Sequence, residues 1–388
     1  MYPARNGDAF LVDAGGPHIL VDGGFASTYQ DYIATDLALL AAHGGRLNLV
    51  ICTHIDGDHI GGLLEFFSLN GPSERRGIEV GAVWHNSLRS LPTSTSRPGN
   101  VNDRMLLEAI RRRGYQDAAV ASANPISARQ GSSLGKLLRQ YAYSWNSGDG
   151  TNCISDGTAP LSVGGNVGLQ VIGPKPERLE ALRDLWLREV RKLGYSGSLD
   201  ASDLLDDAYE MWCASAPPPT VPTAVPIAAS ANLRLADVYT PDTSISNGSS
   251  IAFIISAGPT RLLFLGDAWA EDTVAKLKAM QPEAAPLVFD AIKVSHHGSL
   301  RNTSVELLSV ADSPCFLISS DGSRHGHPDF EVLAEIVDRP APFERQLFFN
   351  YETAATERLR AHASRSGTAF TVRVVDNKWI QVGGVQID

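Results

Sequence analysis

The sequence contains few cysteines, and their spacing excludes two common kinds of site. Its four cysteines in 388 residues are Cys52, Cys153, Cys213 and Cys315. No two of them form a Cys-x-x-Cys pair, so neither a zinc ribbon nor a dithiol redox site is predicted. Scattered thiols of this kind are typical of a reduced chain, and we therefore expect a cytoplasmic location.

The chain has fewer basic than acidic residues, and it lacks long apolar runs. The chain has 33 Lys and Arg against 43 Asp and Glu, a formal net charge of −10. This balance argues against a broadly basic surface that binds nucleic acid by counterion release, although it allows a locally basic or metal-lined cleft. No apolar run approaches the roughly 18–20 residues of a membrane-spanning helix, and the first residues lack the apolar core of a signal peptide. We expect no membrane partner.

The residues that are present predict a globular α/β chain. Hydrophobic residues make up 43% and charged residues 20%, values typical of a folded protein. We expect one domain over residues 1–388, in which two β-rich halves flank an insertion at 88–245 that is rich in loops and helices. Within the insertion, the proline-rich segment 216–229 predicts a long surface loop.

Apolar runs and helical spacing outline the two halves. In the first half, they predict strands at 8–12, 18–22, 47–52 and 80–84 and a helix at 35–42. In the second half, they predict strands at 250–256, 261–265, 289–295 and 315–319, helices at 270–280 and 330–337, and a terminal hairpin of 370–375 with 379–382.

Four potential metal ligands follow one buried strand of the first half. His54, Asp56, Asp58 and His59 come directly after the apolar run 47–52. Imidazoles and carboxylates at this spacing can converge on divalent ions if the backbone turns sharply, which the glycine between the two aspartates permits. The alternative is a solvated acidic turn, and a second cluster in the other half argues against it.

The second cluster also lies at strand ends. Asp267 follows one apolar run, and the pair His296-His297 follows another. An Asp in this place is often only a helix N-cap, but two adjacent histidines before Gly-Ser are less often structural. His85 and His327 are further candidates, with capping or core packing as the alternative for His85.

The order of these motifs resembles the metallo-β-lactamase fold superfamily. The resemblance rests on Asp22-Gly23-Gly24, His-x-Asp-x-Asp-His, Gly266-Asp267 and His296-His297-Gly298-Ser299. The usual second motif is His-x-His-x-Asp-His, and Asp56 stands where its second histidine would be. This departure resembles the metallo-β-lactamase-like domain of ComEC-type competence proteins. The resemblance covers about residues 8–85 and 245–335, and it implies a four-layer αβ/βα sandwich interrupted by the insertion.

The resemblance also implies two divalent metal ions. Carried over by position, His54 and Asp56 would hold one ion, and Asp58 and His59 the other. Asp267 would bridge or flank both. An aspartate in place of a histidine adds a hard oxygen ligand, which should shift the preference from zinc alone toward manganese or a mixed pair.

The roles of the other candidate side chains stay open. Asp58 could also act as a general base, as the resemblance implies. The remaining metal ligands would come from His85, His296, His297 or His327. Phosphate or substrate contacts could come from Lys293, His297, Ser299 and Asn247, although an ordinary turn is the alternative for Asn247.

These features predict a dinuclear metal-dependent hydrolase of phosphodiester bonds, and we expect a nuclease acting on DNA. A shared water between two ions and a clamp on the phosphate oxygens suit that reaction. One alternative is the hydrolysis of a small molecule such as a cyclic nucleotide, a lactone or a thioester. Another is an effector module with a degenerate site, which would dock a protein partner through the insertion.

Overall fold

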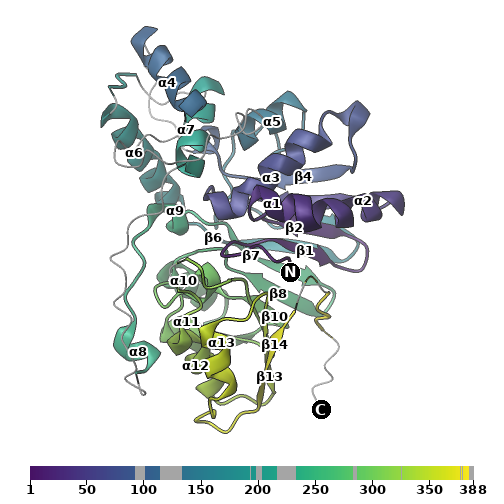
Figure 1. Ribbon diagram of the computed structural model, residues 1–388, viewed down its shortest axis with the longest axis vertical. Coiled ribbons are helices and arrows are strands. Elements are labelled where there is room, and N and C mark those ends of the chain that lie inside the picture. The colour runs from purple at the N-terminus through teal and green to yellow at the C-terminus, as the bar shows by residue number, and fades with distance from the viewer. Residues whose placement is uncertain are drawn as a thin grey trace. The chain divides into compact units, whose positions relative to one another are not determined.

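Figure 1 shows the fold of the chain in a computed structural model. The structure describes residues 1–91, 101–113, 133–192, 194–197, 203–215, 233–282, 286–324, 326–375, 377 and 379–383. Contacts within the chain divide it into two compact units, which are described separately. The first unit comprises Met1–Pro17, Ser155–Lys175 and Thr220–Asp388, and the second comprises His18–Ile154 and Pro176–Pro219.

Three parallel strands of the second unit present their carboxyl ends at one edge. The order is β2 (His18–Val21), β3 (Leu47–Ile51) and β4 (Val80–Trp84). Every residue of β3 except Asn48 is buried, as the apolar run predicts for a strand covered on both faces. Residues that directly follow these strands therefore gather at the same edge.

Helices complete the second unit. α3 buries Leu63, Phe66 and Phe67, and it packs against α5 and α7. Helix α7 also contacts α4 and α5, so these three helices of the predicted insertion pack together, and α5 and α7 pack on α3. The helices are α1 (Ala26–Thr28), α2 (Ala34–Ala42), α3 (Gly57–Asn70), α4 (Val101–Arg113), α5 (Leu134–Gln140), α6 (Pro176–Lys192) and α7 (Asp203–Ser215).

The first unit contains an eight-stranded sheet in the order β14-β13-β12-β10-β8-β7-β6-β5. Neighbours from β8 to β14 run parallel, and neighbours from β5 to β8 run antiparallel. The strands are β5 (Leu161–Gly164), β6 (Val167–Gly173), β7 (Ala252–Ala257), β8 (Thr260–Phe264), β10 (Ala291–Lys293), β12 (Cys315–Ile318), β13 (Arg345–Phe349) and β14 (Phe370–Val374). β5 and β6 come from the predicted insertion, yet they extend this sheet.

Helices α10, α11 and α12 cover a face of this sheet through an apolar core (Figure 1). Val274, Leu307 and Ile336 from the helices pack with Leu263 and Phe316 from the strands. The other elements of the unit are two short paired strands, strand β1 and further helices. Their bounds are β1 (Phe10–Asp13), α8 (Leu235–Val238), α9 (Ile245–Gly248), α10 (Ala270–Met280), β9 (Leu287–Val288), α11 (Val305–Val310), β11 (Ala311–Asp312), α12 (Phe330–Asp338) and α13 (Ala354–Arg360).

The mixed α/β prediction is confirmed, whereas one local prediction is wrong. The expected C-terminal hairpin does not form, because β14 pairs in parallel with β13 and residues 379–383 form no strand. The four-layer stacking and the single domain with its insertion stay predictions, and segment 216–229 lies outside the described residues. Within the described ranges, no helix is both long and apolar enough to cross a membrane.

Candidate metal centre

A buried aspartate organises the histidines of the second unit. Asp22 follows β2 with a left-handed backbone (φ 54°), and its side chain is buried. Its Oδ1 accepts from the Thr53 backbone N–H at 2.7 Å, and its Oδ2 accepts from Thr53 Oγ1 at 2.7 Å. Asp22 Oδ2 also lies 2.9 Å from His59 Nδ1. One carboxylate therefore ties the end of β2 to the loop after β3 and to α3.

These hydrogen bonds fix which nitrogen of each ring carries the lone pair. A carboxylate only accepts, so His59 Nδ1 donates to Asp22 and leaves the lone pair on Nε2. The hydroxyl proton of Thr53 goes to Asp22, so Thr53 Oγ1 accepts from His54 Nδ1, which lies 3.1 Å away. His54 and His59 thus both offer Nε2 as a ligand atom, and their ring centroids are 4.1 Å apart.

Glycines bring α3 close enough for these contacts. Gly23 N–H donates to the His59 carbonyl at 2.8 Å, and Gly62 N–H donates to the Gly24 carbonyl at 2.8 Å. A Cβ on Gly62 would lie 2.0 Å from the Gly23 carbonyl oxygen, a distance that no side chain could adopt. This close approach at Gly62 places His59 beside Asp22.

The two aspartates of the motif lie at the start of α3. Asp56 is the N-cap residue, and its half-exposed carboxylate Oδ2 lies 3.7 Å from His54 Nε2. Asp58 lies in the first turn, where the helix dipole favours a negative charge. The structure thus brings His54, Asp56 and His59 together, with Asp58 next to His59 in the chain.

His85 has a different partner. It ends β4 as predicted, is fully buried, and its Nε2 lies 2.9 Å from Glu210 Oε1 on α7. Glu210 also accepts from the backbone N–H groups of Leu134 and Gly135 at the start of α5. If His85 is a metal ligand, it has to bind through Nδ1, because Glu210 occupies Nε2. Its role as a ligand stays a prediction.

The second group of candidate ligands lies in the first unit. Asp267 follows β8, and His296 and His297 follow β10 in the turn Ser295–Gly298. Both histidines have left-handed backbones, with φ of 46° and 56°. Such conformations cost of order 1–3 kcal/mol each and persist where the surroundings enforce them. Asp267 Oδ2 lies 3.7 Å from His296 Nε2 and 3.8 Å from His297 Nε2.

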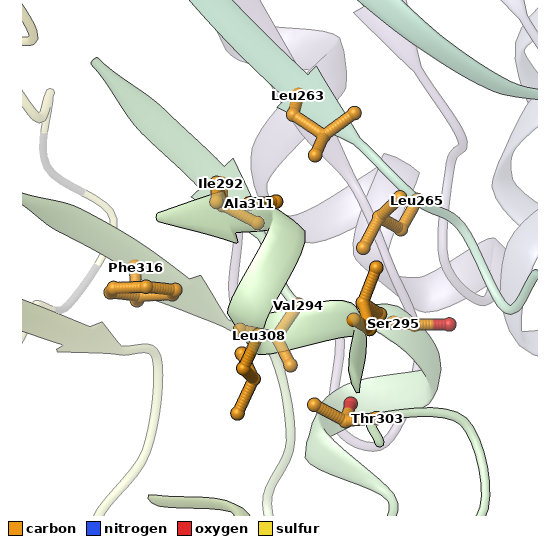
Figure 2. A pocket seen from close by; sticks show the side chains of 10 residues that line it. Leu263, Leu265, Ile292, Val294, Ser295, Thr303, Leu308, Ala311 and Phe316 are labelled. Carbon is orange, nitrogen blue, oxygen red and sulfur yellow. The ribbon is translucent and has the colours of Figure 1, made fainter. Parts of the chain in front are cut away.

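An apolar core lies next to the start of this turn. Figure 2 shows Leu265, Val294 and Leu308 around a cavity of about 10 Å³, which is room for one water molecule at most. Ser295, the first residue of the turn, also lines this cavity, so the turn begins at the apolar core.

Buried charges lie beside His297. Its Nδ1 donates to the Ser319 carbonyl at 2.9 Å and lies 3.3 Å from Asp8 Oδ1. Burial alone would lower the pKa of His297, but the carboxylates of Asp8 and Asp267 outweigh it and hold the pKa above its usual value. Lys293 is buried as well, and its Nζ pairs with Asp8 and donates to the Gly266 carbonyl at 2.9 Å.

The remaining predicted residues lie around this turn. The His327 ring is 5.2 Å from that of His296, its Nδ1 donates to Asp329 at 3.1 Å, and burial lowers its pKa. Asn247 is buried, with Nδ2 3.4 Å from His296 Nδ1. Ser299 is fully buried, and its Oγ accepts from the Arg301 backbone N–H. Their roles as a ligand or substrate contact stay predictions.

A larger cavity lies elsewhere in the first unit. It has a volume of about 310 Å³ and lies among β1, β7, β8 and residues 379–382. Its lining is largely apolar and includes Lys293 but no histidine. It is therefore separate from the candidate ligands.

The donor atoms of both groups fit a divalent metal ion. Within the second unit, His54 presents Nε2 next to the carboxylate of Asp56, and the ring of His59, which also presents Nε2, lies beside that of His54. Within the first unit, His297 presents Nε2 beside the carboxylate of Asp267. Neutral imidazole held through its other nitrogen, together with carboxylate oxygen, is a ligand set for zinc or manganese.

Comparison with known families bears only on the ligand group of the second unit. Residues 2–115 match the Metallo-beta-lactamase superfamily. That segment contains Asp22, His54, Asp56, Asp58 and His59, whereas Asp267 and the His296-His297 pair lie outside it. A finer likeness to ComEC-type proteins was not found, and no curated protein matches the chain.

Two solved structures resemble the chain weakly. One is the metallo-beta-lactamase fold protein YhfI from Bacillus subtilis, with 12% identity, a TM-score of 0.38 and coverage of 98% of this chain and 94% of that one. The other is a metallo-beta-lactamase with an HARLDQ motif from Cronobacter sakazakii, with 18% identity, a TM-score of 0.20 and coverage of 42% and 44%.

Several residues of the site were not among the predicted ligands. The sequence indicates Asp22 only as part of the motif Asp22-Gly23-Gly24, and it does not predict Asp8, Glu210 or Asn302. Asp8 precedes one short apolar run and Asp22 follows another, so the sequence contains a signal for both residues. Glu210 pairs with His85 across 125 positions, and no local pattern marks such a contact.

Proposed function

We propose that the chain is a metallo-β-lactamase-like hydrolase in which both ligand groups hold divalent metal ions. The observation that carries the proposal is the common state of His54, His59 and His297. In each ring Nδ1 is held by a hydrogen bond, which leaves the lone pair on Nε2. The family match of residues 2–115 supports the proposal for the ligand group of the second unit.

The proposed assignment keeps the predicted ligands. In the second unit, His54, Asp56, Asp58 and His59 would be metal ligands, with His85 as a further candidate. In the first unit, Asp267 would be a metal ligand, and the remaining ligands would come from His296, His297 or His327. Two bound divalent ions would lower the pKa of a shared water and stabilise the negative charge of a phosphoryl group. Asp58 would accept the proton of the attacking water. If His296 and not His297 is the metal ligand after β10, a His297 protonated on Nε2 would donate the proton to the leaving oxygen.

The proposed substrate is a phosphodiester, with DNA as the first candidate. The support is chemical, because aspartate oxygens beside imidazoles suit zinc or manganese in a two-metal phosphoesterase. Lys293 would act indirectly, since its ammonium group is buried against Asp8. Asn247 and Ser299 are the proposed polar contacts to the substrate.

The direct test replaces one ligand at a time. Asp58→Ala and His59→Ala should each abolish metal-dependent cleavage of a plasmid and of bis-p-nitrophenyl phosphate while circular dichroism stays unchanged. Asp31→Ala is the matched control, because Asp31 is an exposed aspartate away from the motif. Cleavage by either ligand variant at the rate of the parent would refute the proposal.

A small-molecule hydrolase is the second candidate, and the net charge of −10 favours it over a nuclease. Assays of a plasmid, a cyclic nucleotide, a lactone and a thioester, each with Mn²⁺ or Zn²⁺, separate the two. Plasmid cleavage supports the nuclease, and turnover of only a small substrate supports the alternative. A chain that retains no divalent ion after purification without chelators would instead support the effector module.

A further inference from the structure

Asn302 is a buried residue that makes three hydrogen bonds next to His296. Its Oδ1 lies 2.7 Å from His296 Nδ1. Its Nδ2 donates to Asp242 Oδ2 at 3.0 Å and to the Asp267 carbonyl at 3.0 Å. The side chain is fully buried, so water does not compete for these bonds. All four residues belong to the first unit.

The partners of Asn302 determine the orientation of its amide. Asp242 Oδ2 and the Asp267 carbonyl oxygen are both acceptors, so both must face the NH₂ group. A flipped amide would place Oδ1 against two acceptors at hydrogen-bonding distance and would lose both bonds. Oδ1 therefore faces His296 Nδ1, and this nitrogen must carry the proton.

Asn247 offers the only competing contact recorded for His296 Nδ1 among the described residues. Its Nδ2 lies 3.4 Å from that nitrogen, but it already donates to Asp242 Oδ2 at 2.8 Å. An unprotonated Nδ1 would gain this long contact and would face the Asn302 oxygen at 2.7 Å, lone pair to lone pair. The shorter contact decides in favour of a proton on Nδ1.

We infer that Asp242 and Asn302 are positioning residues that hold neutral His296 in its Nδ1–H form. Asp242 orients the amide, the amide accepts from Nδ1, and the lone pair of His296 is left on Nε2. That nitrogen lies 3.7 Å from Asp267 Oδ2. The inference rests on the proposed function for its purpose: neutral His296 can bind a metal ion or accept a proton through Nε2, but it cannot donate a proton from there.

The tautomer can be measured without any substrate. Long-range ¹H–¹⁵N correlation spectra of the full chain with labelled histidine distinguish a protonated ring nitrogen from one with a lone pair, at a pH where His296 is neutral. His296→Gln assigns the signal. We expect a protonated Nδ1 and an unprotonated Nε2, both as purified and after treatment with a chelator. A predominant Nε2–H form in the chelated protein would overturn the inference.

Substitutions test the cause of the tautomer. Asn302→Leu removes all three bonds at similar volume, and His296 should then shift toward the Nε2–H form in the chelated protein. Asn70→Leu is the matched control, because Asn70 is a buried asparagine that also makes three side-chain hydrogen bonds, in the second unit. Asn70→Leu and Asn247→Ala should leave the tautomer unchanged. An unchanged tautomer in Asn302→Leu would contradict the role of Asn302.

Three possible results bear differently on this inference and on the proposed function. If Asn302→Leu does not fold, the tautomer of the parent still decides whether His296 is held as inferred. If the parent cleaves phosphodiesters, the rate per folded molecule of Asn302→Leu should fall about 10–100-fold, as when the partner of a metal-binding histidine is lost. If no substrate is cleaved, the proposed function fails, and the spectrum tests the tautomer independently.

Discussion

At the scale of single residues, five histidines share one arrangement. Nδ1 donates to Thr53 in His54, to Asp22 in His59 and to Asn302 in His296, and likewise to Ser319 in His297 and to Asp329 in His327. Each ring therefore has Nε2 for a metal ion or a proton. His85 has the opposite arrangement, with Nε2 on Glu210. The spacing of the motifs predicts which histidines gather, but it says nothing about these partners.

Replacement of Asp22 tests the role of one such partner. Asp22→Asn keeps the shape and tolerates the left-handed backbone, but an NH₂ group replaces one acceptor oxygen. With that group facing Nδ1, His59 would have to carry its proton on Nε2, where it blocks metal binding. Metal affinity measured by calorimetry should fall about 10–100-fold. The free energy of unfolding in chelator should fall by about 1–3 kcal/mol.

Asp31→Asn serves as the control for Asp22→Asn, because Asp31 is an exposed aspartate of the same unit. It should change neither quantity. Equal metal affinity in Asp22→Asn and the parent would show that Asp22 does not set the state of His59.

At the scale of elements, patterns that a segment carries by itself were predictable. The apolar run of β3 and the helical spacing of α10 gave the right element, with bounds within a residue or two. β13, α7 and α13 were missed, and the second strand of the predicted C-terminal hairpin does not exist. β14 pairs in parallel with β13 instead of with the segment that follows it in the chain. Such pairing depends on the whole sheet and not on a local pattern.

The contact between α3 and the segment after β2 should be intolerant of added volume. In Gly62→Ala the new methyl group would overlap the Gly23 carbonyl, and relief requires the helix to move away. The free energy of unfolding, measured with urea, should fall by about 1–3 kcal/mol. Gly148→Ala is the control, since nothing lies within 4 Å of its added Cβ, and it should change stability by less than about 0.5 kcal/mol. Similar values for both variants would contradict the close approach.

The Glu210 carboxylate should couple β4, α5 and α7. Glu210→Leu leaves His85 Nε2 and two backbone N–H groups of α5 without their acceptor. The free energy of unfolding should fall by about 3–5 kcal/mol. Combining it with His85→Leu should cost less than the sum of the two single variants, because one buried polar partner has also been removed. Strict additivity in this double-mutant cycle would show that the two side chains do not interact.

At the scale of the whole molecule, the candidate ligands fall into two sets that different parts of the chain position. The set in the second unit follows parallel strands β2 and β3, and the set in the first unit follows parallel strands β8 and β10. In both, side chains gather where neighbouring strands end, as expected for sites in α/β sheets. The sequence predicts both sets. It leaves open which histidine binds a metal ion and which transfers a proton, because these roles depend on buried partners such as Asn302 and Asp8.

The most direct test of the central claim is the metal content of the purified chain. Elemental analysis after dialysis against Mn²⁺ or Zn²⁺ should find about two ions per chain. Both His59→Ala, in the second unit, and Asp267→Asn, in the first, should reduce this number, whereas Asp31→Ala should not. A chain that binds no divalent ion, or one whose metal content is unaffected by either ligand substitution, would contradict metal binding by these two sets.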